Sequence, residues 1–258
     1  MVVRARLDAE MVRRGIVSSR REAADLIEIG QVLVRGSIAD KSSRLVAAGD
    51  PIELQGPPRK FVGRGAEKLE HALAHFGVTV INRSVLDAGS STGGFTDCVL
   101  QNGARRVAGY DVGRNQMHER LLADPRVQQH DKVNVRHLKR TDIPFDCSLI
   151  VADLSFISLT KVFVALASVG SAEPGYDDVE LLVLVKPQFE VGRQDVARGK
   201  GVITDPGLHE QAIRDVAKAS QDAGCKVLGT VMSPIKGADG NTEFVMHAIK
   251  ISDAGTQQ

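Results

Sequence analysis

From about residue 66 onward, the chain alternates short, continuously apolar runs with stretches of helical periodicity. Runs such as LIVAD and LLVLVK lack a polar residue at every second position, so strands formed by them are covered on both faces. Such strands alternating with helices are typical of a mainly parallel sheet with helices on each side. The pattern therefore predicts an α/β domain. Its seven candidate strands are SVLDAG, RVAGYDV, RVQQH, CSLIVAD, LLVLVK, KVLGTVM and TEFVMHAI.

The first 58 residues predict a separate and smaller α+β module. Helical periodicity predicts helices over residues 7–14 and 20–29, and two short strands are expected over 31–36 and 50–54. The stretch GPPRKFVGRG then places two prolines among glycines and basic residues, which interrupts the patterns on both sides. We therefore predict three parts, which are a small domain over 1–58, a linker over 59–65 and the larger domain over 66–252.

Charge is distributed unevenly between these parts. Residues 1–60 contain 11 lysines and arginines against 8 acidic residues, whereas residues 61–258 contain 22 against 24. The basic excess therefore lies in the small module, where an anionic partner such as RNA is expected to bind.

Composition disfavours several other classes of protein. No apolar run approaches the roughly 20 residues that span a bilayer, and the charged start of the chain is unlike a signal peptide. We therefore expect a cytoplasmic protein without a membrane partner. Cys98, Cys147 and Cys225 are isolated from one another, which disfavours a disulfide framework or a metal site and predicts buried thiols.

The segment VLDAGSSTGGF, residues 85–95, is a strand that ends in an acid, a glycine-rich turn and the start of a helix. Such a turn lets backbone N–H groups approach a ligand closely. Its glycines do not have the G-x-G-x-x-G spacing of dinucleotide sites, and Phe95 stands where a P-loop requires lysine. The turn does resemble the first motif of Rossmann-like methyltransferases, which wraps the methionine part of S-adenosylmethionine. A tight strand–helix turn without a ligand is the alternative.

Acidic residues at the ends of the next two strands favour a cofactor site at this turn over a turn without a ligand. Asp111 ends the second strand about 20 residues further on, where a carboxylate can accept both ribose hydroxyls. His130 and Asp131 follow the third strand, where this fold usually contacts the adenine. The predicted S-adenosylmethionine site consists of Asp87, Gly89, Ser90, Ser91, Gly93, Gly94, Asp111 and Asp131.

Three charged residues stand at other strand ends. Asp153 ends CSLIVAD and Lys186 ends LLVLVK, while Glu243 begins the last strand, which runs antiparallel in this fold and so starts at the same edge. Lys68, in the helix before the first strand, is the fourth candidate. A ribose hydroxyl, considered as the methyl acceptor, is a poor nucleophile at neutral pH. A lysine with a lowered pKa can accept or orient the proton of such a hydroxyl. Lys186 is the candidate for that role, either as a neutral base or as a charged orienting group.

The segment DLSF, residues 153–156, invites comparison with the D/N-P-P-Y/F motif of enzymes that methylate exocyclic base nitrogens. In that motif the prolines aim a backbone carbonyl at the amine, and the aromatic ring stacks on the base. Leu154 and Ser155 replace both prolines here. The replacement disfavours an amine as the target, and Lys186 favours a hydroxyl.

Five ordered motifs, RGAEKL, LDAGSSTGGFTD, VADLSFISL, LVKPQFEVG and GNTEF, resemble those of the TlyA (hemolysin A) family. Residues 6–36 resemble the small RNA-binding module of a ribosomal protein. The resemblance implies a fold and activity similar to FtsJ-type methyltransferases, which transfer a methyl group from S-adenosylmethionine to a ribose 2′-hydroxyl, here of a cytidine in ribosomal RNA. It also implies a catalytic tetrad of Lys68, Asp153, Lys186 and Glu243. Related proteins differ around Asp131, where this chain reads HDKVNVR, and many have asparagine at the position of Arg35.

Ribosomal RNA or a ribosomal subunit is therefore the expected partner. Aromatic residues make up only 4% of the chain, which favours recognition of folded RNA through its shape and backbone over stacking on single strands. The candidate phosphate contacts are Arg4, Arg6, Arg13, Arg14, Arg20, Arg21 and Arg35. A solvated helical face is the alternative for these arginines.

Two other functions remain as alternatives. The historical family name suggests a membrane-lytic protein, but no long apolar span or strongly amphipathic helix is visible in the sequence. An RNA-binding module with an inactive methyltransferase domain is the second, and the intact glycine turn disfavours it.

Overall fold

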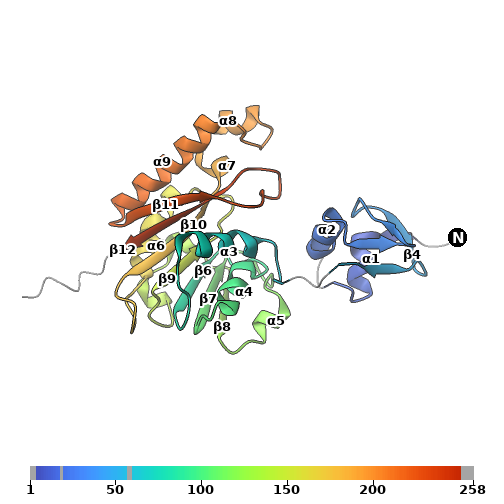
Figure 1. Cartoon of the computed structure of the whole chain (residues 1–258), viewed down its shortest axis with the longest axis horizontal. Helices are drawn as coiled ribbons and strands as arrows, with labels where there is room; N and C mark the ends of the chain where they lie inside the picture. The colour runs from blue at the N-terminus through green and yellow to red at the C-terminus, as the bar shows by residue number, and fades with distance from the viewer. Residues whose placement is uncertain (1–3, 18–19, 57–59, 251–258) are drawn as a thin grey trace, which may run out of the picture. The chain divides into compact units, whose positions relative to one another are not determined.

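The structure, a computed structural model, describes residues 4–17, 20–56 and 60–250, and it divides the chain into two compact units between Lys60 and Phe61 (Figure 1). Residues 57–59, the end of the predicted small domain and the first residue of the predicted linker, lie outside the described residues. The linker positions from Phe61 onward belong to the larger unit, because Phe61 is buried in its core and helix α3 begins at Gly65.

The small unit has an α+β fold with two short sheets. Helices α1 (Leu7–Arg13) and α2 (Arg20–Glu28) confirm the two helices that periodicity predicts. Their apolar faces enclose a core with the strand residues Val32, Val34 and Val46. Strands β3 (Ser37–Ile38), β2 (Val32–Val34) and β5 (Ile52–Leu54) form one antiparallel sheet, and β1 (Arg4–Arg6) pairs with β4 (Leu45–Ala47) in the other.

The larger unit is built on a seven-stranded sheet with the order β11-β12-β10-β9-β6-β7-β8. All neighbouring pairs are parallel except those that involve β12, which confirms the predicted antiparallel last strand. The strands are β6 (Ser84–Ala88), β7 (Arg106–Asp111), β8 (Val127–Asp131), β9 (Leu149–Ala152), β10 (Val179–Val185), β11 (Lys226–Met232) and β12 (Phe244–Lys250).

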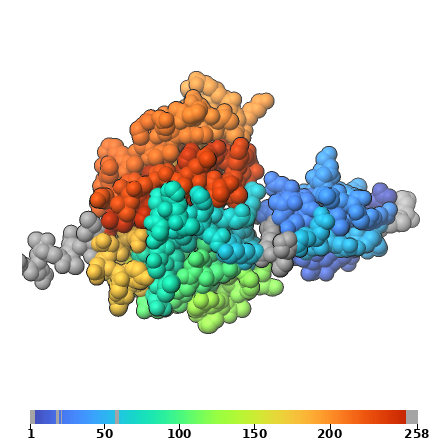
Figure 2. All heavy atoms as spheres, in the orientation of Figure 1, coloured from blue at the N-terminus to red at the C-terminus, as the bar shows by residue number. Residues whose placement is uncertain are grey.

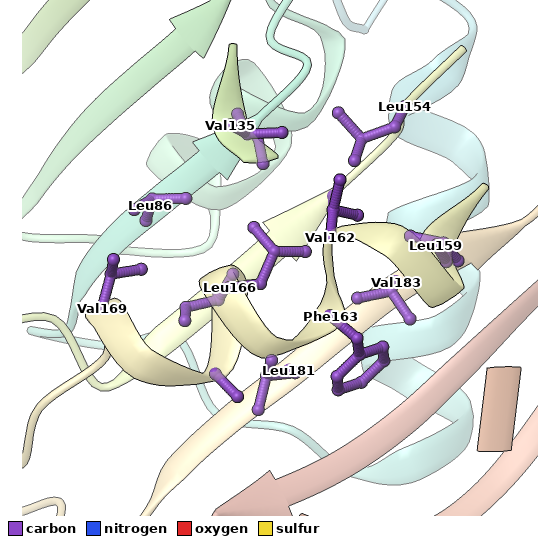
Figure 3. Close-up of a cluster of buried hydrophobic side chains, with 14 of the residues drawn as sticks. Leu86, Val135, Leu154, Leu159, Val162, Phe163, Leu166, Val169, Leu181 and Val183 are labelled. Carbon is purple, nitrogen blue, oxygen red and sulfur yellow. The ribbon is translucent and has the colours of Figure 1, made fainter. Parts of the chain in front are cut away.

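Helices cover both faces of this sheet, as the continuous apolar runs predict. On one face, α3 (Gly65–Phe76) and α4 (Gly94–Gln101) pack over Val85, Val151 and Leu182. On the other, α6 (Phe163–Val169) and α9 (Pro206–Asp222) pack over Leu86 and Leu181. Figure 3 shows the side chains of α6, among them Phe163 and Leu166, on this face. The fold is the predicted Rossmann-like sheet. The edge strand β11 and its neighbour β12 reach the surface between α9 and α3, as the red atoms in Figure 2 show.

Short elements complete the larger unit. Sequence periodicity does not predict the short helices α5 (Glu119–Leu122), α7 (Pro187–Glu190) and α8 (Arg193–Arg198), which have too few turns for a periodic pattern. Three single turns of 3₁₀ helix lie at Val135–His137, Arg140–Asp142 and Leu159–Lys161. Among the described residues, none of the helices combines the length and the apolar character required to cross a bilayer.

Candidate active site

The glycine turn after β6 lies against the end of β9. Gly89 has a φ of +85°, and a Cβ atom added there would lie 2.5 Å from the carbonyl oxygen of Asp153. Gly93 has a φ of +93°, and its Cβ atom would lie 2.2 Å from Leu121. Both positions therefore favour glycine for the left-handed conformation, and Gly89 also for the close approach of the backbone at Asp153. The turn reaches α4 at Gly94, so the predicted strand–turn–helix arrangement is present.

Asp87 is fully buried beneath this turn. Its Oδ2 accepts a hydrogen bond of 2.6 Å from the hydroxyl of Thr96, whereas Oδ1 has no hydrogen-bond partner among the described residues. Burial raises the pKa of Asp87 to about 7, and the nearby carboxylates of Asp153 and Asp111 act in the same direction, against the hydrogen bond from Thr96. A buried acceptor that the protein leaves unpaired is suited to a cationic ligand.

Asp111 and Asp131 follow at the ends of β7 and β8 and hold the loop between them. Asp111 accepts hydrogen bonds from the backbone N–H groups of Ser91, at 2.9 Å, and Gly113, at 2.6 Å. Asp131 accepts from the backbone N–H of Asn115 at 2.7 Å and from the Gln129 amide at 3.0 Å, and these bonds lower its pKa. The predicted cofactor acids therefore lie at three adjacent strand ends.

Gln129 and His130 connect these strand ends further. The hydroxyl of Ser90 in the glycine turn donates to Gln129 Oε1 at 3.0 Å. The ring of His130 stacks on Tyr110 with a centroid distance of 4.6 Å, and burial lowers the pKa of His130. Its Nε2 has no hydrogen-bond partner within the described part of the chain. A second unpaired polar atom therefore lies near the position predicted for the adenine.

The four candidate tetrad residues form two ion pairs. Lys68 Nζ lies 2.5 Å from Glu243 Oε2, and both side chains are buried. Lys186 Nζ lies 2.6 Å from Asp153 Oδ1. The N-terminus of α3, which carries Lys68, also approaches Asp153, since a Cβ atom on Gly65 would lie 3.6 Å from Asp153 Oδ2.

Strand register explains why these residues meet. Val185 is paired with Phe244 in the antiparallel ladder, so Lys186 and Glu243 stand on adjacent strands just beyond the last paired position. In the parallel ladder Ala88 is paired with Ala152, and the N–H of Asp153 donates to the carbonyl of Ala88. The candidate catalytic and cofactor residues therefore converge on one edge of the sheet, where α/β enzymes carry their active sites.

Known proteins resemble this chain in sequence and in fold. The chain matches the FtsJ-like methyltransferase family over residues 61–250 and the S4 domain over residues 5–52. It is 42% identical over 247 residues to the 16S/23S rRNA (cytidine-2′-O)-methyltransferase TlyA of Mycobacterium tuberculosis, which covers 95% of this chain and 90% of that relative. The chain belongs to the TlyA family of FtsJ-like methyltransferases.

Other TlyA-family relatives match over similar lengths. Hemolysin A of Brachyspira hyodysenteriae is 39% identical over 249 residues, which are 95% of this chain and 99% of that protein. The solved structure of a putative hemolysin from Streptococcus thermophilus superimposes with a TM-score of 0.76 at 35% identity, covering 99% of this chain and 93% of that one. Both domains of the TlyA architecture are therefore represented here.

Sequence reasoning missed several residues of this TlyA-family site. Ser155 accepts a hydrogen bond of 2.9 Å from Lys186 Nζ, whereas in the sequence motif DLSF it is notable only as the replacement of a proline. Phe156 is 91% exposed with a φ of +64°, and its ring lies 5.4 Å from that of Phe189. Thr96 is also absent from the predicted set, although its place just after the glycine turn could have indicated it.

The predicted RNA-binding arginines of the S4 domain separate into different environments. Arg6 and Arg20 both pair with the buried carboxylate of Asp8, at 2.9 Å each, and their side chains stay 46% and 59% exposed. Hydrogen bonds from Arg6 first, and then from Arg20, lower the pKa of Asp8 to about 2 against the effect of burial, so it is charged at neutral pH. One fixed carboxylate therefore holds two guanidinium groups together.

The other predicted arginines are arranged differently. Arg14 pairs with Glu10 at 2.7 Å and also donates to the carbonyl groups of residues 47, 48 and 50, so it stabilises the fold. Arg13 shares Glu10, and Arg35 pairs with Asp50 at 2.5 Å. Arg4 is exposed on β1, and the side chain of Arg21 lies outside the described atoms.

Proposed function

We propose that this chain transfers a methyl group from S-adenosylmethionine to the ribose 2′-hydroxyl of a cytidine in ribosomal RNA. The observation that carries the proposal is the ion pair between Lys186 and Asp153, which lies next to the glycine turn at the same edge of the sheet. The activity named for the Mycobacterium tuberculosis relative supports the same substrate. Since ribosomal RNA is the proposed substrate, we also place the protein in the cytoplasm.

The residues at the glycine turn fit S-adenosylmethionine. The unpaired Oδ1 of Asp87 is a buried acceptor suited to the cationic amino group, and Asp111, at the end of β7, is proposed to accept hydrogen bonds from the ribose hydroxyls. When bound, S-adenosylmethionine supplies an electrophilic methyl group on a sulfonium. The predicted set of Gly89, Ser90, Ser91, Gly93, Gly94 and Asp131 completes the proposed site.

The four tetrad residues are proposed to supply the groups that bind and orient the 2′-hydroxyl. Lys186 is proposed to bind the 2′-hydroxyl and either to accept its proton or to orient its lone pair. Asp153 fixes the position of the Lys186 ammonium group through their ion pair. The buried pair of Lys68 and Glu243 stands beside it and keeps its own charges balanced, so it adds no net charge to the site.

Mapping 2′-O-methylated nucleotides in ribosomal RNA tests the proposal directly. RNA from cells that lack this protein is expected to lose methylation at one or more cytidines, and the wild-type chain is expected to restore it. The Lys186→Ala chain, expressed to the same level, serves as the matched control and should not restore the modification. Identical methylation maps with and without the protein would rule out the proposed activity.

Arg6 and Arg20, which share Asp8, are proposed to contact RNA phosphates in the S4 domain. The Arg6→Ala/Arg20→Ala double variant is expected to bind ribosomal RNA about ten-fold more weakly or worse, because two phosphate contacts are lost. The slope of log affinity against log salt should become shallower by about 2 for the same reason. Filter binding over a range of salt concentrations measures both quantities.

The control for this prediction is Arg214→Ala/Lys218→Ala. Both are exposed cations on α9 that pair with acids one helical turn away, so this variant removes the same amount of charge. It should bind RNA nearly as well as the wild type. Equal losses in the two double variants would show that only net charge matters and would contradict a specific role for the arginine pair.

A further inference from the structure

The loop after β9, residues 153–159, exposes two side chains between two buried leucines. Leu154 and Leu159 are buried in the core that Figure 3 shows, whereas Ser155 and Phe156 between them are exposed. The positive φ of Phe156 is a conformation that bulky residues rarely adopt. Strained backbone of this kind persists only where the surroundings hold it, and it gathers at functional sites.

The segment that follows β10 holds this loop in place. Glu190 accepts a hydrogen bond of 2.5 Å from the side chain of Ser158 and one of 2.8 Å from the N–H of Leu159. Glu190 ends the short helix α7, whose first residue follows Lys186 directly. Lys186 contacts the beginning of the loop, and Glu190 contacts its end. The position of Ser155 relative to Lys186 is therefore determined from both sides.

The contacts of the Lys186 ammonium group differ in kind. Its Nζ donates a well-formed hydrogen bond of 2.9 Å to Ser155 Oγ. Asp153 Oδ1 is closer, at 2.6 Å, and forms an ion pair with the ammonium group. Asp153 supplies the opposite charge, whereas Ser155 fixes a bond direction.

We propose that Ser155 is a positioning residue of the methyl transfer, which holds Lys186 Nζ in the orientation that faces the ribose hydroxyl. An ammonium group has three N–H directions, and a lysine side chain has four rotatable bonds before it. With one direction held by Ser155 and the charge held by Asp153, another direction is left for the substrate. This inference rests on the proposed 2′-hydroxyl transfer.

Ser155→Ala and Ser155→Thr test the inference in the full-length protein, with Ser168→Ala as the control. Ser168 is an exposed serine of α6 whose hydroxyl donates to the carbonyl of Ala165, so its loss removes the same atoms elsewhere. Ser155→Ala should lower kcat about ten-fold, because Lys186 is no longer oriented, with little change in KM for RNA. Ser155→Thr keeps the hydroxyl and should retain most of the activity.

Two further measurements separate positioning of Lys186 from a merely structural role of Ser155. S-adenosylmethionine affinity and the unfolding temperature should stay at wild-type values.

Three outcomes would overturn the inference. They are an unchanged kcat in Ser155→Ala, an equal loss of kcat in Ser168→Ala, and a loss of cofactor affinity that parallels the loss of kcat. Failure of the wild-type protein to methylate ribosomal RNA would instead overturn the proposed function itself, so the two failures are distinguishable.

Discussion

Lys186→Ala is expected to lower methyl transfer to ribosomal RNA by about a thousand-fold or more while S-adenosylmethionine binds almost as tightly as before. The Lys186 side chain lies next to Asp153 and Ser155 at the proposed acceptor position, while the residues proposed to bind the cofactor belong to β6, β7, β8 and the turn after β6. The proposed role of Lys186 concerns the hydroxyl and not the methyl donor, so the variant should lose the reaction and keep the cofactor. Single-turnover methylation and calorimetric cofactor binding measure the two effects separately.

Lys186→Arg and Lys218→Ala are the matched variants for this prediction. Arginine keeps the positive charge but is larger, planar and very unlikely to lose its proton, so Lys186→Arg should also be nearly inactive. Lys218 is an exposed lysine of α9 paired with Asp222, and its replacement should leave the rate unchanged. If Lys186→Ala kept more than about a tenth of the wild-type rate, the assigned role of Lys186 would be wrong.

Asp87→Asn is expected to weaken S-adenosylmethionine binding by about a hundred-fold or more and also to change how stability depends on pH. The folded protein holds the pKa of Asp87 at about 7, above its ordinary value of 3.8, mainly because the carboxyl is buried. Between these two pKa values the folded state therefore binds a proton that the unfolded state has released. Stability due to this group is present at low pH and is lost as the pH rises toward 7.

The pH dependence gives a measurable difference between the two proteins. From pH 5 to pH 8, the wild type should lose about 3 kcal/mol of unfolding free energy relative to Asp87→Asn, because asparagine does not ionise. Any steric or hydrogen-bonding cost of the asparagine is the same at both pH values and cancels in this comparison. Urea unfolding of the cofactor-free proteins at the two pH values measures it. Parallel pH profiles would contradict the assigned ionisation of Asp87.

Much of the fold could be predicted because its signals are local. The continuous apolar runs around Val151 and Val183 indicate strands covered on both faces, and the structure places them at the centre of the sheet. Charges that end apolar strands also predicted the edge at which the candidate site lies. The pairing of β1 with β4 was not predicted, since three-residue strands have too short a pattern and their register joins Arg4 to Ala47.

The sequence by itself indicated the candidate site residues, because a charge at the end of a buried strand and a glycine-rich turn are local features of the chain. Only the tertiary structure decided how those residues combine. Lys68 and Glu243 are 175 residues apart in the chain, and their ion pair exists because α3 packs beside the start of the antiparallel strand β12. The hydrogen bond between Lys186 and Ser155 likewise depends on the packing of two loops, which no periodic pattern encodes.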